Sequence, residues 1–241
     1  LTTGREKLSA VNKELGFPEI EQSHAFLGSK AYLRLLDLKD VDAVLVSTPA
    51  FLHPLHLEAA IDAGKHVYCE KPVAVDVPGV EQVRRAGKKA QGKVSLAVGF
   101  QIRHATPYVE MVRRIKEGQI GDIVTIQASY FAGSIPVKWR DDVSPAEARL
   151  RAWFWDRALS GDILVEQGIH VVDICNWMLG AHPLRATGTG GRKGRTDKGD
   201  VWSHYNVNFI YPNDVHVTFQ STQFDPGYGD VCERIFGTKG I

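Results

Sequence analysis

The 241-residue chain has little of what marks several classes of protein. Its three cysteines (Cys69, Cys175 and Cys232) are an odd number without metal-site spacing, which favours buried thiols over disulfides or a metal site. The net charge of +1 gives no reason to expect nucleic acid or an anionic membrane surface as a partner. No apolar run approaches the roughly 18–20 residues that span a bilayer. The composition is that of a soluble globular protein with one or two domains.

The two ends of the sequence predict a piece of a longer protein. The chain begins at Leu1 rather than Met, inside an expected amphipathic helix over 5–15. It stops just after Gly237-Thr238-Lys239-Gly240, a turn pattern that should lead into another strand. An export signal would precede Leu1, so a cytoplasmic location is the default expectation.

Apolar periodicity divides the chain into two expected domains, 1–102 and 103–241. The first alternates helices and strands, which predicts a parallel sheet with helices on both faces. Its expected helices are 5–15, 28–38, 54–64 and 78–90, and its expected strands are 41–47, 66–69 and 94–100. The strand 41–47 is almost continuously apolar, which is typical of a strand buried on both faces.

The second part predicts an α+β domain with a largely antiparallel open sheet. A helix is expected over 107–117, a strand over 123–131 and one continuous helix over 161–179. The segments 201–210 and 214–222 alternate with period two around a Pro-Asn-Asp turn, which predicts a hairpin. The fold class is therefore α/β, a Rossmann-type parallel sheet without its first strand, followed by this second sheet.

Two predicted strands end in polar residues at positions where parallel sheets bind ligands. Ser47-Thr48-Pro49 follows the first strand, and Glu70-Lys71-Pro72 follows the second. Ligands of parallel sheets bind beyond the carboxyl ends of the strands, and neighbouring strands would bring both segments to one edge. Lys71 is therefore a candidate binding residue, with Pro72 shaping its backbone. The alternative is a surface lysine paired with Glu70, and position alone does not separate the two interpretations.

The expected helix over 161–179 carries carboxylates and a histidine at helical spacing. Asp162, Glu166, His170 and Asp173 would share one face at intervals of four, four and three. A carboxylate one turn from a histidine can orient the ring and tune its pKa, as in acid–base catalysts. A divalent metal on Glu166 and His170 stays open, although no HExxH motif or third ligand is present. The simplest alternative is a solvated polar stripe.

Two further patterns have simpler explanations. Residues 188–194 look like a phosphate-binding loop, but Lys193 stands where a glycine is needed and no helix follows, so we expect a flexible basic loop. Trp153 and Trp155 could stack on the apolar face of a sugar ring, whereas core packing explains at least one of them.

Taken together, these segments resemble the Gfo/Idh/MocA oxidoreductase family, which includes glucose–fructose oxidoreductases and inositol dehydrogenases. The shared segments span nearly the whole chain. In order, they are Ser47-Thr48-Pro49, His53, residues 63–67, Glu70-Lys71-Pro72, residues 118–123, Gly168-x-His170-x-x-Asp173 and residues 237–240. The resemblance implies a Rossmann domain and an α/β domain whose open sheet commonly forms a homo-oligomer interface. It also implies a sugar or polyol substrate.

The resemblance implies roles for individual residues as well. Six residues would lie along a nicotinamide cofactor, NAD or NADP: Ser47, Thr48, Pro49, His53, Glu70 and Lys71. Six would contact the substrate: Lys71, Arg103, Trp155, Asp162, Glu166 and His170. The catalytic residues would be Lys71, His170 and Glu166, without a metal. Glu166 stands where the family usually has aspartate, and Ser160 and Asp162 stand where it usually has glycine, so the substrate is left open.

Elementary chemistry supports these roles independently. When hydride leaves a carbinol carbon, the oxygen must lose its proton as the carbonyl forms. A neutral histidine such as His170 can accept that proton near pH 7, whereas a free lysine, with a pKa of about 10.4, is already protonated. An ammonium at Lys71 would stabilise negative charge developing on the oxygen.

The family's G-x-G-x-x-G fingerprint, its first strand and the residue that selects NAD or NADP would all lie upstream of Leu1. We therefore expect this chain alone to bind nucleotide poorly. Three functions stay open: a sugar or polyol dehydrogenase, which leads; a redox-neutral glycoside-cleaving enzyme that uses the same site; and a non-catalytic sugar- or nucleotide-binding protein. Intact Lys71 and His170 count against the third.

Overall fold

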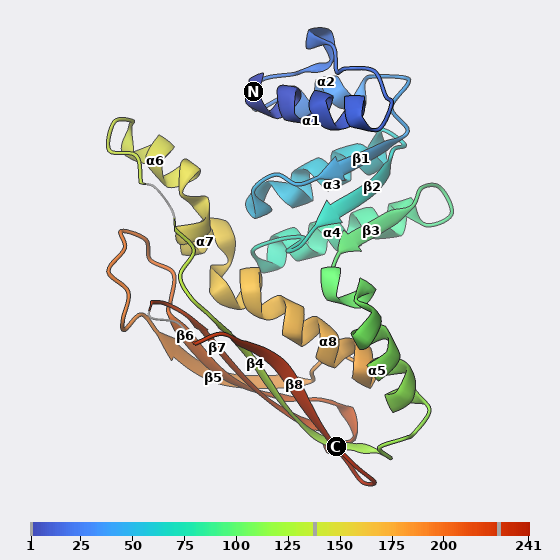
Figure 1. Cartoon of the computed structure of the whole chain (residues 1–241), viewed down its shortest axis with the longest axis vertical. Helices are drawn as coiled ribbons and strands as arrows, with labels where there is room; N and C mark the ends of the chain where they lie inside the picture. Colours follow the sequence, from blue (N-terminus) through green and yellow to red (C-terminus); the bar gives the residue numbers. More distant parts are fainter. Residues whose placement is uncertain (1, 137–138, 226–227) are drawn as a thin grey trace.

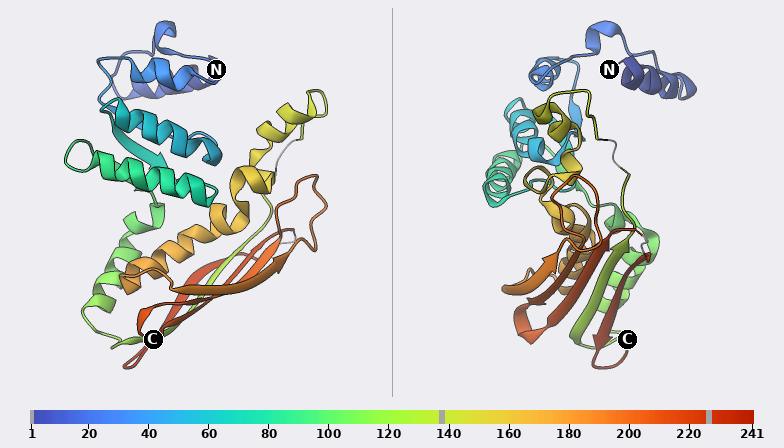
Figure 2. Two further views of the ribbon diagram at one scale, coloured as in Figure 1. Left: turned by 180° about the vertical axis from the view of Figure 1, so that it is seen from behind. Right: turned by 90° about the vertical axis from the view of Figure 1, so that its left-hand side faces the viewer.

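The computed structural model describes residues 2–136, 139–225 and 228–241. Figure 1 shows the N-terminal part above a large C-terminal sheet, with helix α8 (Ile169–Leu179) between them. Figure 2 shows the same arrangement from two other sides. Within the described part of the chain, none of the helices combines the length and apolar character needed to cross a bilayer.

The N-terminal part is a three-stranded parallel sheet with strand order β1-β2-β3. The strands are β1 (Ala43–Val46), β2 (His66–Glu70) and β3 (Leu96–Gly99). The helices are α1 (Thr2–Glu14), α2 (Ala31–Leu36), α3 (His53–Asp62) and α4 (Val77–Ala90). These bounds confirm the predicted alternation of helix and strand.

Local chemistry explains where these helices start and stop. Gly64 has a φ of +74°, a left-handed conformation that favours glycine and ends α3. Asp76 caps α4 by accepting a hydrogen bond from the backbone N–H of Gly79 at 2.8 Å, and Pro78 occupies the first turn. The end of α3 and the start of α4 thus lie close to their predicted positions.

The prediction that the first strand is buried on both faces is wrong. Val46 in β1 is buried against α3, but Leu45 beside it is 65% exposed. Successive side chains of a strand point to opposite faces, and the core of this part lies on the face that carries Val46, Val67 and Cys69. Although its sequence is almost continuously apolar, β1 is therefore covered on one face only in the described structure.

The C-terminal sheet has five strands in the order β5-β6-β7-β4-β8. The strands are β4 (Ile123–Ala132), β5 (Arg185–Gly191), β6 (His204–Ile210), β7 (His216–Gln223) and β8 (Asp230–Gly237). Among the described strands only the β4–β7 pair is parallel, so the predicted, largely antiparallel sheet is confirmed, as is the β6–β7 hairpin. The prediction of a flexible loop at 188–194 is wrong for its first half, because 185–191 forms β5, paired along its length with β6.

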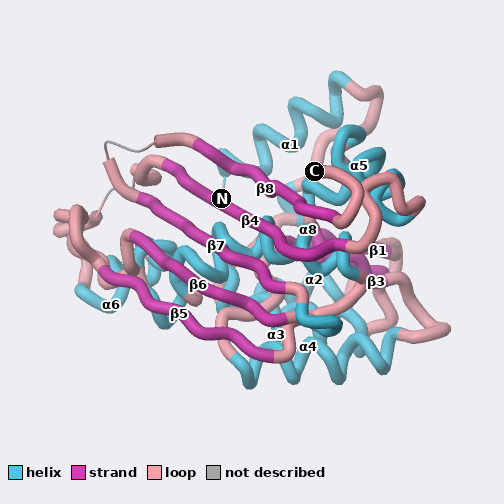
Figure 3. The backbone as a smooth tube through the Cα atoms, turned by 90° about the horizontal axis from the view of Figure 1, so that it is seen from below, coloured by secondary structure: helices cyan, strands magenta, loops and turns pink. Residues whose placement is uncertain are grey.

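Helices cover one face of this sheet. They are α5 (Thr106–Lys116) and α8 (Ile169–Leu179), whose apolar side chains join those of β4, β6, β7 and β8 in the larger core. Figure 3 looks onto the opposite face, on which no helix of the described chain lies. Two short helices, α6 (Pro145–Arg151) and α7 (Arg157–Ser160), lead from β4 towards α8.

The helix predicted over 161–179 is confirmed in part, because the backbone is helical from Ile163 to Leu179 but differs at its start and in one turn. Gly161 and Asp162 both have positive φ angles, 76° and 69°, so the chain leaves the helical path there. A π-helical turn, Leu164–Gly168, follows, and only then does α8 begin at Ile169. A π-helical turn inserts extra backbone into a helix and is frequent at functional sites. The regular spacing of four, four and three that was expected to align four polar residues is therefore interrupted by the bend at Asp162 and by the π-helical turn.

Candidate active site

The carboxyl ends of β1 and β2 lie side by side. Val46 pairs with Cys69 in the parallel register, so Ser47-Thr48-Pro49 and Glu70-Lys71-Pro72 leave the sheet at the same edge. This confirms the predicted shared edge. Gly99 on β3 faces Glu70, and a Cβ there would lie 2.7 Å from Glu70 Oε2, so the glycine makes room for that carboxylate. The Lys71–Pro72 peptide bond is cis.

Lys71 reaches from this edge to the π-helical turn of the second part. Its Nζ donates to Glu166 Oε2 at 2.7 Å and to the Glu166 carbonyl oxygen at 2.6 Å. The side chains are 19% and 7% exposed, so the ion pair is largely withdrawn from water. The alternative of a surface lysine paired with Glu70 is therefore wrong. An ammonium has three hydrogens, and these two contacts leave one for another acceptor.

Burial raises the pKa of the Glu166 carboxyl, and the positive charge of Lys71 acts in the opposite direction. A buried carboxylate loses hydration, which disfavours its charged form, and the ammonium 2.7 Å away restores part of that loss. The charged form of Glu166 thus depends on Lys71. The ion pair holds the Lys71 ammonium in place. Substitution of either residue would leave the other charge buried without its partner.

His170 lies one residue into α8 and is buried. Desolvation and, to a smaller extent, the charge of Lys71 lower the pKa of its ring to about 4, although the charge of Asp173 acts in the opposite direction. The imidazole is therefore neutral near pH 7 and has a nitrogen able to accept a proton. Its Nδ1 is buried and meets no hydrogen-bond partner among the described residues. The ring of Tyr130 stacks at 6.2 Å between centroids, a contact that the sequence analysis missed.

The predicted orientation of His170 by a neighbouring carboxylate is wrong in this geometry. Glu166 is bound to Lys71, and Asp173 accepts two hydrogen bonds from Arg103, from Nε at 2.7 Å and from Nη2 at 2.9 Å. Both carboxylates therefore have cationic partners of their own. The Tyr130 ring lies nearly parallel to the His170 ring, at an interplanar angle of 24°.

Close packing holds the π-helical turn against the C-terminal sheet. A Cβ on Gly168 would lie 2.8 Å from the Phe219 ring, so only glycine permits this approach. Gln167 extends the contact, because its Nε2 donates to the carbonyl oxygens of Tyr130 and Thr222 and to Ser221 Oγ. Gln167 is a positioning residue that the sequence analysis missed, since its partners lie 37 or more positions away.

The other predicted site residues surround this centre and already have partners. Asp162 Oδ1 accepts from the backbone N–H groups of Ile163 and Trp202, at 2.7 and 3.0 Å, so the carboxylate holds the bend before the π-helical turn. Trp155 is 2% exposed, in agreement with the core-packing alternative. Substrate contacts by Arg103, Asp162 and Trp155 stay predictions.

His53 connects the two loops at the edge of the parallel sheet. The ring is 2% exposed, with Nδ1 at 2.7 Å from the Pro72 carbonyl oxygen and Nε2 at 2.6 Å from that of Thr48. Both nitrogens are engaged with backbone, so this side chain supports the loops rather than offering a free group to a ligand. A direct cofactor contact by His53 stays a prediction.

Metal binding by these residues has no support in the described part of the chain. There, no group of three or more His, Cys, Asp or Glu side chains is placed to hold an ion. Cys69 and Cys175 are buried free thiols, as expected from the sequence, whereas Cys232 is only half-buried.

Two family models match the chain. Residues 108–241 match the "GFO/IDH/MocA C-terminal domain", and residues 1–100 match "Oxidoreductase family, NAD-binding Rossmann fold". The chain belongs to the GFO/IDH/MocA family. The predicted family and fold class are thereby confirmed.

Curated relatives of this family member include two sugar- or polyol-converting enzymes. The chain is 31% identical to dTDP-3,4-didehydro-2,6-dideoxy-alpha-D-glucose 3-reductase from Streptomyces violaceoruber, over 87% of this chain and 52% of that protein. It is 30% identical to inositol 2-dehydrogenase from Rhizobium meliloti, over 71% of this chain and 46% of that protein. The chain thus spans about half the length of these relatives.

Solved structures show the same fold. Aldose-aldose oxidoreductase from Caulobacter crescentus, complexed with glycerol, superposes with a TM-score of 0.73 at 26% identity, covering 96% of this chain and 63% of that one. Scyllo-inositol dehydrogenase from Lactobacillus casei, with bound NAD(H) and scyllo-inositol, gives 0.73 at 23% identity, covering 98% and 64%.

Proposed function

We propose that this chain forms the catalytic core of a nicotinamide-dependent oxidoreductase acting on a hydroxyl of a sugar, polyol or sugar derivative. The observation that carries the proposal is the pairing of Lys71 with Glu166 beside a buried, neutral His170, at the carboxyl edge of the parallel sheet. The relatives named above act on sugars or inositol, which supports the same substrate class.

The residues present fit the nicotinamide end of NAD or NADP. Ser47-Thr48-Pro49 and Glu70-Lys71 lie on adjacent loops at the edge where parallel sheets bind ligands, and Gly99 keeps the third strand end free of a side chain. When bound, the cofactor would accept or return a hydride at its nicotinamide ring. No G-x-G-x-x-G motif occurs in residues 1–241.

In the oxidative direction, the substrate hydroxyl would lie against Lys71 and His170. The C–H bond of the carbinol carbon breaks with its electron pair leaving as hydride, while the O–H proton passes to the neutral ring of His170. The remaining Lys71 hydrogen would stabilise negative charge on the oxygen as the C=O bond forms. Glu166 would act through Lys71, by holding the ammonium in place.

A turnover assay tests this proposal. The full-length protein is mixed with NAD or NADP and a panel of sugars, polyols and aryl glycosides, and nicotinamide reduction is followed by absorbance. Lys71→Met should lower kcat by about 100-fold or more, as loss of electrostatic stabilisation does elsewhere, while the nucleotide Kd changes little. Lys88→Met, at an exposed position of α4, is the matched control and should leave kcat unchanged.

Equal turnover of the Lys71→Met and Lys88→Met proteins would contradict the role of Lys71. Aryl release without net nicotinamide reduction would point instead to the redox-neutral glycoside-cleaving alternative. The predicted homo-oligomer also stays a proposal, supported by the face of the C-terminal sheet that carries no helix in the described structure (Figure 3).

A further inference from the structure

A second ion pair joins the carboxyl edge of the parallel sheet to α8. Arg103 lies in a short 3₁₀ turn, Gln101–His104, that follows β3. Its guanidinium donates to both carboxylate oxygens of Asp173 in α8, from Nε at 2.7 Å and from Nη2 at 2.9 Å. Two parallel bonds fix both the distance and the orientation of an arginine–carboxylate pair. Lys71 and Arg103 thus form two separate bridges between this edge and the segment that carries His170.

The surroundings of Asp173 make the pair more than a surface salt bridge. The Asp173 side chain is 11% exposed and that of Arg103 is 38% exposed. The guanidinium also lies over the ring of Trp177, one turn further along α8, at 5.4 Å from the ring centroid. Removal of Arg103 would therefore leave a largely buried carboxylate without its cationic partner.

Asp173 lies one helical turn after His170. Side chains three residues apart are neighbours on a helix, with about 5–6 Å between their Cβ atoms. Desolvation lowers the pKa of the His170 ring, as does the charge of Lys71, whereas the charge of Asp173 raises it. An unbalanced carboxylate at this distance favours the protonated ring, and a cation bound to the carboxylate opposes that effect. Arg103 can therefore influence His170 without touching it.

Titratable groups on the elements around α8 are neutral, balanced or exposed. Glu166, in the π-helical turn, is bound to Lys71. Burial raises the pKa of Tyr130, the residue of β4 that stacks on the imidazole, so its phenol is uncharged near pH 7. His104, beside Arg103 in the 3₁₀ turn, is exposed.

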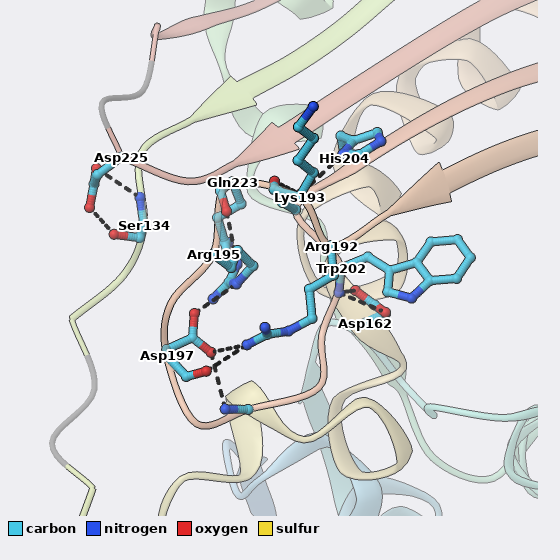
Figure 4. Close-up of polar contacts among 12 residues, drawn as sticks. Ser134, Asp162, Arg192, Lys193, Arg195, Asp197, Trp202, His204, Gln223 and Asp225 are labelled. Atoms are coloured by element: carbon cyan, nitrogen blue, oxygen red, sulfur yellow. Dashed lines mark hydrogen bonds and ion pairs between the residues drawn. The ribbon is translucent and has the colours of Figure 1, made fainter.

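Other acidic residues near α8 bind partners of their own. Asp162 Oδ1 accepts from the backbone N–H of Trp202 at 3.0 Å, as Figure 4 shows. Glu233 of β8 accepts from the hydroxyl of Tyr108 of α5 at 3.0 Å, and burial raises the pKa of this carboxyl to about 7. Within the described chain, Asp173 is thus the carboxylate whose charge acts on the imidazole.

We propose that Arg103 is a positioning residue that acts on the reaction through Asp173: it holds this carboxylate, balances its charge and so extends to lower pH the range in which His170 is a neutral proton acceptor. The role in turnover rests on the proposed function, whereas the coupling of the three side chains does not. The family resemblance implies instead that Arg103 contacts the substrate, and the two roles predict different results.

Three variants separate charge from structure. Arg103→Gln leaves the Asp173 charge unbalanced and should raise the pKa of the His170 ring by about 1 pH unit. The double variant Arg103→Gln/Asp173→Asn carries no charge at either position, like the balanced wild-type pair, so its ring should titrate as in wild type. Arg103→Lys keeps a cation beside Asp173, and its ring pKa should also stay close to that of wild type.

NMR titration of the imidazole in the full-length protein measures these shifts without turnover. The His170 signal is identified by its loss in His170→Asn. Arg84→Gln, which breaks an exposed arginine–glutamate pair in α4, is the matched control and should leave the ring pKa unchanged. If Arg103→Gln does not fold, Asp173→Asn gives the opposite charge change: its ring should stay neutral at pH 4, where the wild-type ring is about half protonated.

Nicotinamide reduction is measured on the same variants with a substrate found in the turnover assay. For Arg103→Gln, kcat/KM should be about threefold lower than in wild type at pH 4.5 and unchanged at pH 8, because only protonation of the ring differs. A KM raised equally at both pH values, with an unchanged ring pKa, would overturn the proposal in favour of a substrate contact.

Either of two titration results also overturns the proposal: a ring pKa in Arg103→Gln equal to that of wild type, or a raised pKa that persists in the double variant. The second result would mean that Arg103 acts by packing and not by charge. A ring pKa that follows the charges in a protein that reduces no nicotinamide would support the coupling of Arg103 to His170 and contradict the proposed oxidoreductase function.

Discussion

The ion pair between Lys71 and Glu166 should contribute to the stability of the fold, apart from any role in catalysis. Lys71→Met removes the cation and leaves a carboxyl that is 7% exposed. Removing one partner of a buried pair costs about 3–5 kcal/mol when the other stays charged. Because Lys71 is 19% exposed and the carboxyl can take up a proton, we expect a smaller loss, about 2–3 kcal/mol at pH 8.

The sign of the pH dependence follows from the pKa of Glu166. Burial already raises that pKa, and loss of Lys71 removes a charge that lowers it. A carboxyl with a raised folded-state pKa contributes its full stability below the unfolded-state pKa, and this stability is lost as pH rises through the folded-state value. The stability difference between wild type and Lys71→Met should therefore be below about 1 kcal/mol at pH 5 and grow towards pH 8, at about 1.4 kcal/mol per unit of pKa shift.

Urea unfolding of wild type, Lys71→Met, Glu166→Gln and the double variant at pH 5 and pH 8 measures this difference. The double variant has no carboxyl to titrate at this position, so its loss of stability should be equal at the two pH values. A loss for Lys71→Met that is independent of pH, or larger at pH 5, would refute the account of Glu166 as a buried carboxyl dependent on Lys71.

Two other residues lead to predictions. For His170, whose pKa is lowered to about 4, kcat/KM for substrate oxidation should stay level from pH 8 down to about 5.5 and fall only near pH 4, because the ring remains neutral until then. A fall of kcat/KM centred near pH 6.5 in the pH–rate profile would contradict the assignment of His170 as a buried neutral base. For His53, replacement by Ala should destabilise the fold by about 2–5 kcal/mol, because it leaves a cavity in place of a buried ring whose nitrogens lie 2.7 and 2.6 Å from the Pro72 and Thr48 carbonyl oxygens. A melting temperature equal to that of wild type would show that His53 does not join the two loops.

Local patterns in the sequence were sufficient for much of the fold. The end of α3 at Gly64, the start of α4 at Asp76-Val77-Pro78 and the β6–β7 hairpin depend on neighbouring residues, so their chemistry is visible in the sequence. The shared edge of β1 and β2 also followed from sequence, because parallel neighbouring strands must end on the same side.

Other predictions failed where tertiary contacts override local preference. The spacing of Asp162, Glu166 and His170 fits one helix. A bend and a π-helical turn occur instead, where Gly168 packs against Phe219 and the backbone N–H of Trp202 donates to the Asp162 carboxylate. Burial of a face of β1 likewise depends on the elements that cover it. The apolar content of the strand alone does not show whether one face or both are covered.

The sequence by itself determined the order of the helices and strands, the family resemblance and the residues at the edge of the parallel sheet. Only the tertiary structure decided that Lys71 pairs with Glu166, 95 positions away, and that Arg103 binds Asp173, 70 positions away. The physical reason is the range of the interactions. Capping, turn formation and periodicity act over a few residues, whereas desolvation and ion pairing depend on which distant side chains the fold brings together.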